Sequence, residues 1–503
     1  MNYYTTNLSL NPYLSSIFSG TLLILLYPFF DFSWLSWFAI VPFFIGISKV
    51  KNWKDAFLSG WLMGLIWLAG QFYWLIIFGR VPYLLFCIAY PPWLGLYGIG
   101  AYKIDKVTKG VWRIILLSGL WVAIEFLRGT GEFGLPWSGL GLAMYKNLPL
   151  IQIAEFTGIG GVSLLIVMVN AFLAEIIIKR PQKLLLFGLF LAWLIIVVFI
   201  WGGERINKFS NFKPKIKVMI VQPNIPQEIK WDPPHLPEII DIYHNLIFKA
   251  ISYKPYLIVM PETAIPSELV EGSEFMSLST SWARYSSAYF LMGGVGYREG
   301  DFFNSLFLFT PRGRLIGEYD KIRLVHFGEY LPGRKWFEKF SIFKELLTPV
   351  SRFSSGKEVK VFNTPKLRFG TVICFESVFP NLARLISKQG GEAIVIATND
   401  AWFYDTTAPY HHFAFSVFRA VENRRFVVRC GNTGISAFIS PAGKIIAKTS
   451  LLERTLLVDE IASLSYKTFY TCFGDVFSLF WLIIVFYWLA YVELEQINEK
   501  SIS

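Results

Sequence analysis

Three side chains with complementary chemistry stand where predicted strands or hairpins end. Glu262 follows the apolar run Leu257–Met260, Lys321 follows a predicted hairpin, and Cys374 ends an apolar strand. A thiol with a reference pKa of about 8.5 is a poor nucleophile until a base accepts its proton. A glutamate can be that base, and a lysine can stabilise both the thiolate and the oxyanion of an acyl-transfer intermediate. Together the three residues predict acyl transfer through a cysteine.

Each of these residues also has a plain structural interpretation. Glu262 is compatible with a helix cap, Lys321 with a solvated charge run, and Cys374 with an ordinary core position. Glu376 argues against the last of these, because residues i and i+2 share a face of an extended chain and a carboxylate is an unfavourable core neighbour. The combination therefore weighs more than any single residue.

Other uses of histidine and cysteine are less well supported. Histidine is the usual base for a cysteine, and the chain has five histidines. None of them stands in a recognisable cysteine-protease context, although a spatial neighbour stays open. His411 and His412 lack metal-ligand spacing, so we expect no metal and no cofactor. The cysteines show no paired spacing and predict no disulfide framework; they are Cys87, Cys374, Cys430 and Cys472.

A polar block from about residue 204 to 470 must position the three side chains. Its short apolar runs, separated by turn signals and helical segments, predict a layered α/β domain with two hairpins, at 305–319 and 437–448. The expected strands are Ile216–Gln222, Leu257–Met260, Phe290–Gly293, Ser305–Thr310, Phe369–Ile373, Ala393–Thr398, Phe426–Cys430 and Ser436–Ser440. The expected helices are Pro237–Ser252, Glu274–Ser287, Asn381–Lys388 and Pro409–Arg424.

The rest of the chain is strongly apolar. Of 503 residues, 54% are hydrophobic and 17% are charged, and the mean hydropathy is +0.46, which excludes a disordered chain or an ordinary soluble enzyme. A bilayer core of about 30 Å needs roughly 20 apolar residues of helix. We expect eight such spans, of which the first two are short enough to form a hairpin that spans only partly. They are Leu14–Phe30, Trp34–Ser48, Ala56–Phe78, Pro82–Tyr102, Val111–Leu127, Gly158–Ile178, Leu184–Trp201 and Phe473–Val492.

The distribution of lysine and arginine predicts the orientation. Basic residues concentrate in the second, fourth and sixth connections, which places both termini in the cytoplasm and the polar block outside. No lysine or arginine precedes Lys49, so the first segment is predicted to be an anchor and not a cleaved signal peptide. The same loops explain much of the net charge of +11, and we expect no nucleic-acid partner. The basic residues are Lys49, Lys51, Lys54, Lys103, Lys106, Lys109, Arg113, Lys179, Arg180 and Lys183.

The order of Glu262, Lys321 and Cys374 resembles the triad of the carbon–nitrogen hydrolase (nitrilase) superfamily. Further motifs, and the order of seven helices, polar domain and last helix, resemble the apolipoprotein N-acyltransferases over essentially the whole chain. The resemblance implies a membrane domain at 1–203, an extracytoplasmic nitrilase-like α-β-β-α sandwich at 204–470, and an eighth transmembrane helix with a cytoplasmic tail at 471–503. The motifs are Gly134–Trp137, Gln222–Gln227, Lys230–Pro233, Phe327–Pro332, Ile373–Glu376, Asn399–Phe403 and Asn432–Ile435.

In that family the enzyme moves an acyl chain from a phospholipid to the α-amino group of a lipoprotein's diacylated N-terminal cysteine. The resemblance implies that Glu262 is the general base, Lys321 the electrostatic stabiliser and Cys374 the thiol that carries the acyl group as a thioester. It also implies ping-pong kinetics, a monomer, and a location in the bacterial inner membrane with the catalytic domain on the periplasmic side.

The resemblance further implies that activity depends on Trp231, Glu329 and Glu376. Phe375, directly after the nucleophile, departs from the family pattern, because members often have tyrosine there. No hydroxyl can therefore act at this position, although the phenylalanine ring can still pack against acyl chains.

Two other classes of function stay open. A membrane-tethered amidase or nitrilase-type hydrolase would use the same three residues with water in place of the amine, but would not need seven preceding helices. A non-enzymatic lipid-binding or transport protein would carry more ionisable residues in mid-membrane.

Overall fold

The computed structural model describes residues 11–179, 184–210, 212–213, 215–330 and 353–502, and the chain divides into two compact units. The first unit comprises Met1–Ile206 and Phe473–Ser503, and the second comprises Asn207–Cys472. Four residues discussed above lie outside the described part of the chain: Arg180, Lys183, Leu331 and Pro332.

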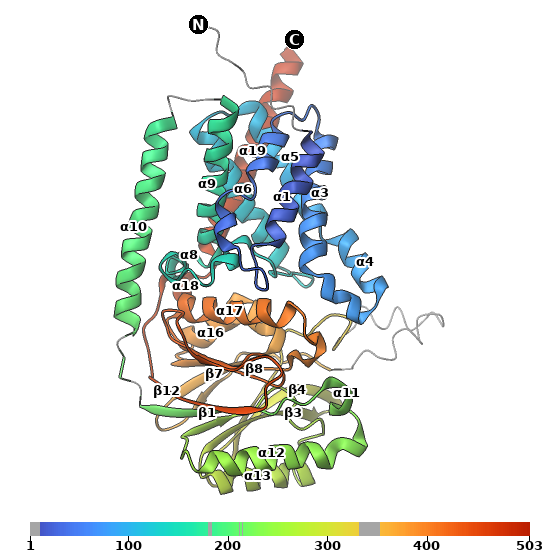
Figure 1. Cartoon of the computed structure of the whole chain (residues 1–503), viewed down its shortest axis with the longest axis vertical. Coiled ribbons are helices and arrows are strands. Elements are labelled where there is room, and N and C mark those ends of the chain that lie inside the picture. The colour runs from blue at the N-terminus through green and yellow to red at the C-terminus, as the bar shows by residue number, and fades with distance from the viewer. Residues whose placement is uncertain (1–10, 180–183, 211, 214, 331–352, 503) are drawn as a thin grey trace. The chain divides into compact units, whose positions relative to one another are not determined.

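The first unit is a bundle of apolar helices (Figure 1). Its core includes the buried rings of Trp67, Tyr97 and Trp121, of which that of Trp121 contacts the other two. Helices α3 and α5 approach closely at Gly60 and Gly98, where an added Cβ would lie 2.1 Å and 2.2 Å from a carbonyl oxygen of the opposite helix. Small residues at such crossings are typical of helix packing in membranes. The helices are α1 Pro12–Ile24, α2 Val41–Ile47, α3 Trp53–Gln71, α4 Arg80–Ala89, α5 Pro92–Val107, α6 Val111–Gly129, α7 Leu148–Ile151, α8 Ala154–Thr157, α9 Ile159–Lys179, α10 Leu185–Ser210 and α19 Val476–Ile502.

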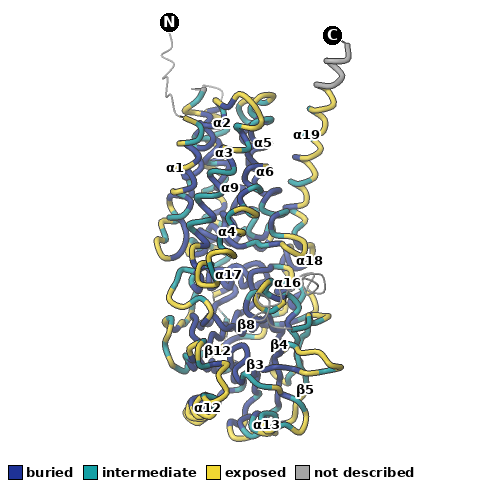
Figure 2. Tube along the Cα trace, turned by 90° about the vertical axis from the view of Figure 1, so that its right-hand side faces the viewer, coloured by how far each residue is buried: buried dark blue, intermediate teal, exposed yellow. Residues whose placement is uncertain are grey.

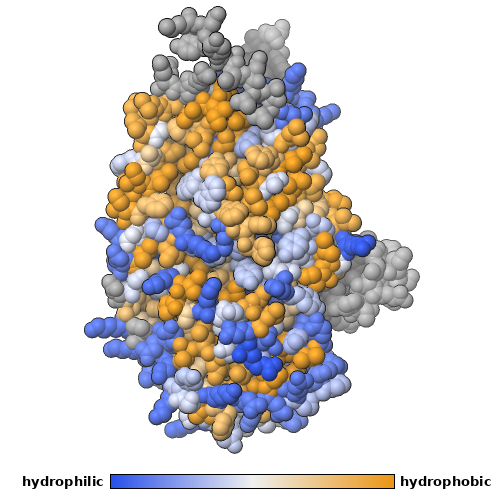
Figure 3. Space-filling model, viewed as in Figure 1, coloured by the Kyte–Doolittle hydropathy of each residue, from blue (hydrophilic) through white to orange (hydrophobic). Residues whose placement is uncertain are grey.

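Four helical segments in the described chain are long and apolar enough to cross a membrane: Arg80–Val107, Ile159–Ile178, Leu185–Ser210 and Val476–Glu495. The segments Pro12–Ile24 and Ser33–Ile47 are shorter apolar helices. Hydrophobic side chains gather over the helices of this unit on the face drawn in Figure 3. The eight spans expected from the sequence therefore stay a prediction, while the helical, apolar nature of this region is confirmed.

The second unit has four layers, in which two six-stranded sheets lie between two pairs of helices (Figure 1). Apolar side chains of both sheets form one core between the sheets. Helices α12 (Leu236–Ile251) and α13 (Glu274–Ser286) cover the outer face of the first sheet. Helices α16 (Pro380–Lys388) and α17 (Ala408–Asn423) cover the second sheet. Figure 2 shows the buried strands β3 and β8 inside this sandwich and the exposed outer side of α12. This is the α-β-β-α arrangement that the resemblance implies.

The strand order brings several strand ends to one edge of each sheet. The first sheet has the order β12-β1-β2-β3-β4-β5 and the second β11-β10-β9-β8-β7-β6. Strands β1, β2 and β3 are parallel neighbours, and so are β7, β8 and β9. The carboxyl ends of parallel strands are the places where α/β folds usually put functional groups.

The main differences from the expected strands lie in β3, β4, β6 and β12, and β4 begins at Asp301, before the expected Ser305. Strand β3 continues to Arg298 and forms a hairpin with β4 through Glu299 and Gly300, both with positive φ. Strands β6 and β12 were not expected; β12 is a half-buried edge strand, which gives no continuous apolar run. The strands are β1 Ile216–Gln222, β2 Leu257–Val259, β3 Tyr289–Arg298, β4 Asp301–Phe309, β5 Leu315–Asp320, β6 Val361–Asn363, β7 Arg368–Ile373, β8 Ala393–Thr398, β9 Phe426–Gly431, β10 Ala437–Ile439, β11 Ile445–Lys448 and β12 Thr455–Ile461.

The helices and short turns of the second unit connect these strands. They are α11 Gln227–Lys230, α12 Leu236–Ile251, α13 Glu274–Ser286, η6 Cys374–Val378, α16 Pro380–Lys388, η7 Asp400–Phe403, α17 Ala408–Asn423 and α18 Phe469–Phe473.

Candidate active site

The structure brings Glu262, Lys321 and Cys374 into one buried site of the second unit. Glu262 lies in the loop after β2, Lys321 directly follows β5, and Cys374 directly follows β7. Their exposed fractions are 5%, 1% and 8%. The Nζ atom of Lys321 lies 3.0 Å from Oε1 of Glu262, and the charges of both act on the Cys374 thiol. A base, a cation and a thiol therefore share a site that water scarcely reaches.

Glu262 is held as an ionised carboxylate by three donors. Its Oε1 accepts hydrogen bonds from Nζ of Lys321 at 3.0 Å and Nδ2 of Asn304 at 2.7 Å, and its Oε2 accepts from the main-chain N–H of Asn399 at 2.8 Å. Burial opposes ionisation, but the charge and hydrogen bond of Lys321 outweigh it and hold the pKa of Glu262 below its usual value. Glu262 is therefore charged at neutral pH and ready to accept a proton.

Lys321 lies between two carboxylates. Besides Glu262, its Nζ contacts Oε1 of Glu329 at 2.8 Å, and the main-chain N–H of Val325 donates to Oε2 of Glu329 at 2.9 Å. Burial disfavours the ammonium form, but the two carboxylates raise the pKa of Lys321 well above its usual value. Lys321 is thus a permanent positive charge beside the thiol, and Glu329 orients it.

Cys374 is placed by an unusual backbone conformation. It is the first residue of η6 and has a φ of 51°, in the left-handed region that non-glycine residues rarely adopt. Burial and the negative charge of Glu262 raise the pKa of the Cys374 thiol, while Lys321 lowers it. The thiol is therefore protonated at rest, and its proton must leave as the sulfur attacks.

The prediction that Glu376 shares one face of an extended strand with the Cys374 thiol is wrong, because both residues lie in η6. The chain leaves β7 at Ile373 and turns into η6, so the Glu376 carboxylate points back and joins the start of this turn to the loop after Lys321. Burial raises the pKa of Glu376 to about 7, and main-chain hydrogen bonds oppose this rise. Its donors are the main-chain N–H groups of Ile373 (2.7 Å), Ile322 (2.6 Å) and Arg323 (3.0 Å) and the hydroxyl of Tyr319 (2.8 Å).

Trp231 and Phe375 differ in their surroundings. Trp231 is 43% exposed directly after α11, whereas Phe375 is half-buried, with its ring centroid 5.0 Å from that of Phe379 in an edge-to-face contact. Neither side chain makes a polar contact with the three central residues.

Lys230 was not expected to take part in the site. It is 1% exposed, and its Nζ donates to the main-chain oxygen of Glu262 at 3.0 Å. Burial lowers the pKa of Lys230 to about 8, although Glu262 and Cys374 raise it. Lys230 is part of the motif Lys230–Pro233, but nothing in the neighbouring residues predicts that its side chain is buried.

Asn304 was also missed. Its Nδ2 donates to Oε1 of Glu262 at 2.7 Å and to Oε1 of Glu329 at 2.9 Å, so one amide holds both carboxylates. It lies within β4, one residue before the predicted strand Ser305–Thr310, and a single asparagine there carries no signal. Only the pairing of β4 with its neighbours brings it to the site.

Family models match both units. Residues 217–468 match the model described as carbon-nitrogen hydrolase, and residues 19–172 match that described as the apolipoprotein N-acyltransferase N-terminal domain. The fold and the matched residues thus define the second unit as a carbon–nitrogen hydrolase domain. Among solved structures, Nit3 of Saccharomyces cerevisiae, a nitrilase superfamily member, aligns with 50% of this chain and 91% of its own at 20% identity and a TM-score of 0.39.

Curated relatives resemble the chain over nearly its whole length. Apolipoprotein N-acyltransferase of Geobacter metallireducens is 35% identical over 488 residues, which cover 93% of this chain and 92% of that protein. Proteins of the same name from Rickettsia typhi (30% identity; 90% and 92% covered) and Thermotoga maritima (28%; 92% and 90%) are also similar. The chain therefore belongs to the apolipoprotein N-acyltransferases.

Proposed function

We propose that the chain transfers an acyl chain from a phospholipid, through a thioester on Cys374, to the α-amino group of a lipoprotein's diacylated N-terminal cysteine. Family membership supports the reaction. The observation that carries the assignment to residues is the buried contact of Glu262 with Lys321, whose two charges both act on the Cys374 thiol.

The first half-reaction forms the thioester. Glu262 takes the Cys374 proton as the sulfur attacks the ester carbonyl of the phospholipid, which gives a tetrahedral oxyanion. Lys321, with a main-chain N–H near Phe375, stabilises that oxyanion. The carbon–oxygen ester bond then breaks, Glu262 returns the proton to the departing alkoxide, and the lysophospholipid leaves.

The second half-reaction consumes the thioester. The free amine of the lipoprotein attacks the thioester carbonyl, Glu262 accepts a proton from the nitrogen, and the carbon–sulfur bond breaks. The proton passes to the sulfur and restores the resting thiol. Because one lipid leaves before the other arrives, the kinetics are of the ping-pong type.

The arrangement in the membrane is part of the same proposal. We infer eight spanning segments, both termini in the cytoplasm and the second unit on the periplasmic side of the bacterial inner membrane, from the basic loops and the apolar helices. The chain acts as a monomer with a phospholipid donor and a lipoprotein acceptor, without nucleic acid, metal or cofactor. A periplasm-specific reporter should be active when fused after residue 210 and inactive when fused after residue 503. The reverse pattern would overturn the orientation.

Exposed aromatic side chains support contact with acyl chains. Trp402 and Tyr404 are 47% and 44% exposed, and η7, which contains Trp402, starts at the buried Asp400 beside the site. Exposed tryptophan and tyrosine are typical of surfaces that meet lipid. Ordinary packing at the surface is the competing explanation for these rings.

The decisive experiment uses the purified full chain with phospholipid as the only substrate. Intact-protein and peptide mass spectrometry should show a hydroxylamine-labile acyl group on the Cys374 peptide, together with one equivalent of lysophospholipid. Cys374→Ala should abolish both products. Cys472→Ala is the matched control, because Cys472 is exposed, and it should leave both unchanged.

Two outcomes contradict the proposal in different ways. Neither adduct nor lysophospholipid would count against acyl transfer and return Cys374 to a core role. Lysophospholipid with free fatty acid, but without transfer when a diacylated lipopeptide is added, would instead favour a membrane-tethered hydrolase with the same residues.

A further inference from the structure

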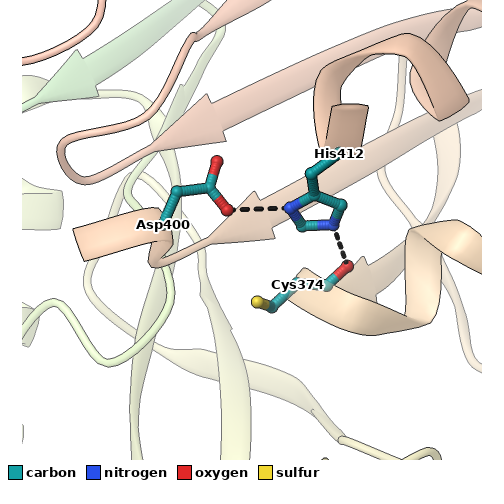
Figure 4. Close-up of side chains that lie close together, drawn as sticks. All are labelled: Cys374, Asp400 and His412. Atoms are coloured by element: carbon teal, nitrogen blue, oxygen red, sulfur yellow. Dashed lines mark hydrogen bonds and ion pairs between the residues drawn. The ribbon is translucent and has the colours of Figure 1, made fainter. Parts of the chain in front are cut away.

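A histidine holds the main chain of the proposed nucleophile. The Nε2 atom of His412, on α17, lies 3.0 Å from the carbonyl oxygen of Cys374 (Figure 4). A carbonyl oxygen only accepts hydrogen bonds, so this contact is a hydrogen bond in the forms of the ring that carry a hydrogen on Nε2, and the Ser377 hydroxyl, 2.9 Å from the same atom, then accepts from it as well. The contact ends on the residue whose backbone has the left-handed φ of 51°. His412 therefore binds the strained turn that presents the thiol.

Buried charges fix the orientation of the His412 ring. Its Nδ1 lies 2.8 Å from Oδ1 of Asp400, which also accepts from the hydroxyl of Thr398 at 2.9 Å. The other oxygen of Asp400 contacts Nη2 of Arg429 at 2.9 Å. These side chains are almost fully buried. Burial opposes ionisation of Asp400, but His412 and Arg429 hold its pKa well below the usual value. The ring is thus held at both nitrogens.

This cluster of a thiol, a carboxylate and an imidazole does not suit a metal ion. Polar atoms of Cys374, Asp400 and His412 lie within 4.8 Å of one another. Nη2 of Arg429, however, lies 3.0 Å from Nδ1 of His412 and already neutralises Asp400. A second cation there would meet the guanidinium, and Nε2 has no lone pair to offer while it donates to a carbonyl.

We propose that His412 is a positioning residue, which holds the carbonyl of Cys374 so that its thiol points at the acyl donor, and that it is not the base. This inference rests on the proposed function, because the attack by Cys374 is the step that it serves. A base would need a lone pair directed at the sulfur, and the nitrogen nearest to the Cys374 main chain donates instead. The imidazolium donates from both ring nitrogens, whereas in the neutral Nε2–H tautomer Nδ1 instead accepts from Nη2 of Arg429, 3.0 Å away. Both forms keep the donor on Nε2, so the role does not require a change of protonation.

Two amide substitutions separate these roles. In His412→Gln the side-chain amide can reach the place of Nε2 and donate to the Cys374 carbonyl, whereas in His412→Asn it reaches only the place of Nδ1. Neither amide is a base at neutral pH. Ser377→Ala is the control, because Oγ of Ser377 lies 2.9 Å from the same Nε2 but makes no contact with the Cys374 carbonyl.

The measurement is the single-turnover rate of acyl-thioester formation in the full chain, with the KM for phospholipid and the pH profile. We expect His412→Asn to lower the rate about 100-fold with little change in KM, because small displacements of a reacting group cost about that much. His412→Gln should keep the rate within about fivefold and retain the wild-type pH profile, and Ser377→Ala should stay within about twofold.

Two results would overturn the inference. If His412→Gln is as slow as His412→Asn, the imidazole acts through its basicity; if His412→Asn is fully active, the contact does nothing for the reaction. If His412→Asn fails to fold, the rate and pH profile of His412→Gln still test whether the side chain acts as a hydrogen-bond donor or as a base. Iodoacetamide is a small electrophile that Cys374 can attack only with the same transfer of its proton to Glu262, so alkylation of Cys374 in the same variants tests the positioning without a lipid substrate. It thus separates failure of this inference from failure of the proposed function, in which wild type would form no thioester.

Discussion

Lys230→Met should produce a chain that is more stable and less active than wild type at neutral pH. The Lys230 ammonium is buried, with one hydrogen bond, to the main-chain oxygen of Glu262. Its pKa is lowered from 10.5 to about 8. Folding therefore makes the charged form of Lys230 less favourable by about 3 kcal/mol relative to the unfolded chain. Methionine has a similar length and shape, so it fills the same space without the charge.

The sign of the pH dependence follows from proton binding. Between about pH 8 and pH 10.5 the unfolded chain binds more protons at Lys230 than the folded chain. The stability of wild type therefore rises with pH in this window. Loss of the hydrogen bond costs the variant about 1 kcal/mol, which leaves a net gain of about 2 kcal/mol at pH 7. The gain should disappear by about pH 9.5.

The assay is thermal unfolding of the detergent-solubilised chain, followed by tryptophan fluorescence at pH 7 and pH 9.5. A gain of about 2 kcal/mol corresponds to about 4–8 °C in a domain of this size. Lys217→Met is the matched control, because Nζ of Lys217 also donates to a main-chain carbonyl, at 3.2 Å, but in an exposed hydrogen bond of a half-buried residue. A Lys230→Met variant that melts below wild type at pH 7, or whose advantage does not shrink at pH 9.5, would refute the reasoning. Activity should fall about 10- to 100-fold, because a positive charge beside the thiolate is lost.

Three further substitutions test the hydrogen bonds of the site. Asn304→Leu should lower kcat about 10- to 100-fold, measured by transfer to a lipopeptide, because Glu262 and Glu329 both lose a donor; an unchanged kcat would contradict that role. Glu376→Gln should slow thioester formation more than about tenfold, because the glutamine amide cannot accept hydrogen bonds from all four donors of Glu376. A wild-type rate would show that the reaction does not depend on these hydrogen bonds. Phe375→Tyr should stay within about twofold in kcat, because the half-buried ring already has its edge-to-face partner; a larger gain would indicate that the hydroxyl contributes to the reaction.

The layers of the second unit were predictable from the sequence because its strands are short apolar runs between turns. Strands β7 and β8 are buried almost throughout and were expected nearly as they occur. Edge strand β12 was missed, because its residues are mostly half-buried and show neither a long apolar run nor an alternating pattern. The helices of the first unit were found as apolar runs, but their number across a membrane depends on tilt and breaks that composition does not determine.

The site residues that follow a strand could be predicted from the sequence. Those that reach the site only through the packing of distant strands and helices could not. Glu262, Lys321 and Cys374 each follow a strand, and the structure brings them together. Asn304 and His412 reach the site from the middle of β4 and α17. Such positions carry no local signal, because only the packing of distant segments decides which polar side chains meet.

The charges of the site allow the thiol to be both protected and reactive. Lys321 contacts two carboxylates, and Lys230 lies against the main chain of Glu262, so the resting site is close to neutral with a protonated thiol. Transfer of the Cys374 proton to Glu262 moves one negative charge from oxygen to sulfur within the field of the same two lysines. The net charge of the buried site does not change, so the step avoids the large cost of creating a new charge in a low-dielectric region. The thiolate thus exists only while Glu262 holds its proton. Because oxidation and exchange follow thiolate character, the resting cysteine is protected from side reactions between turnovers.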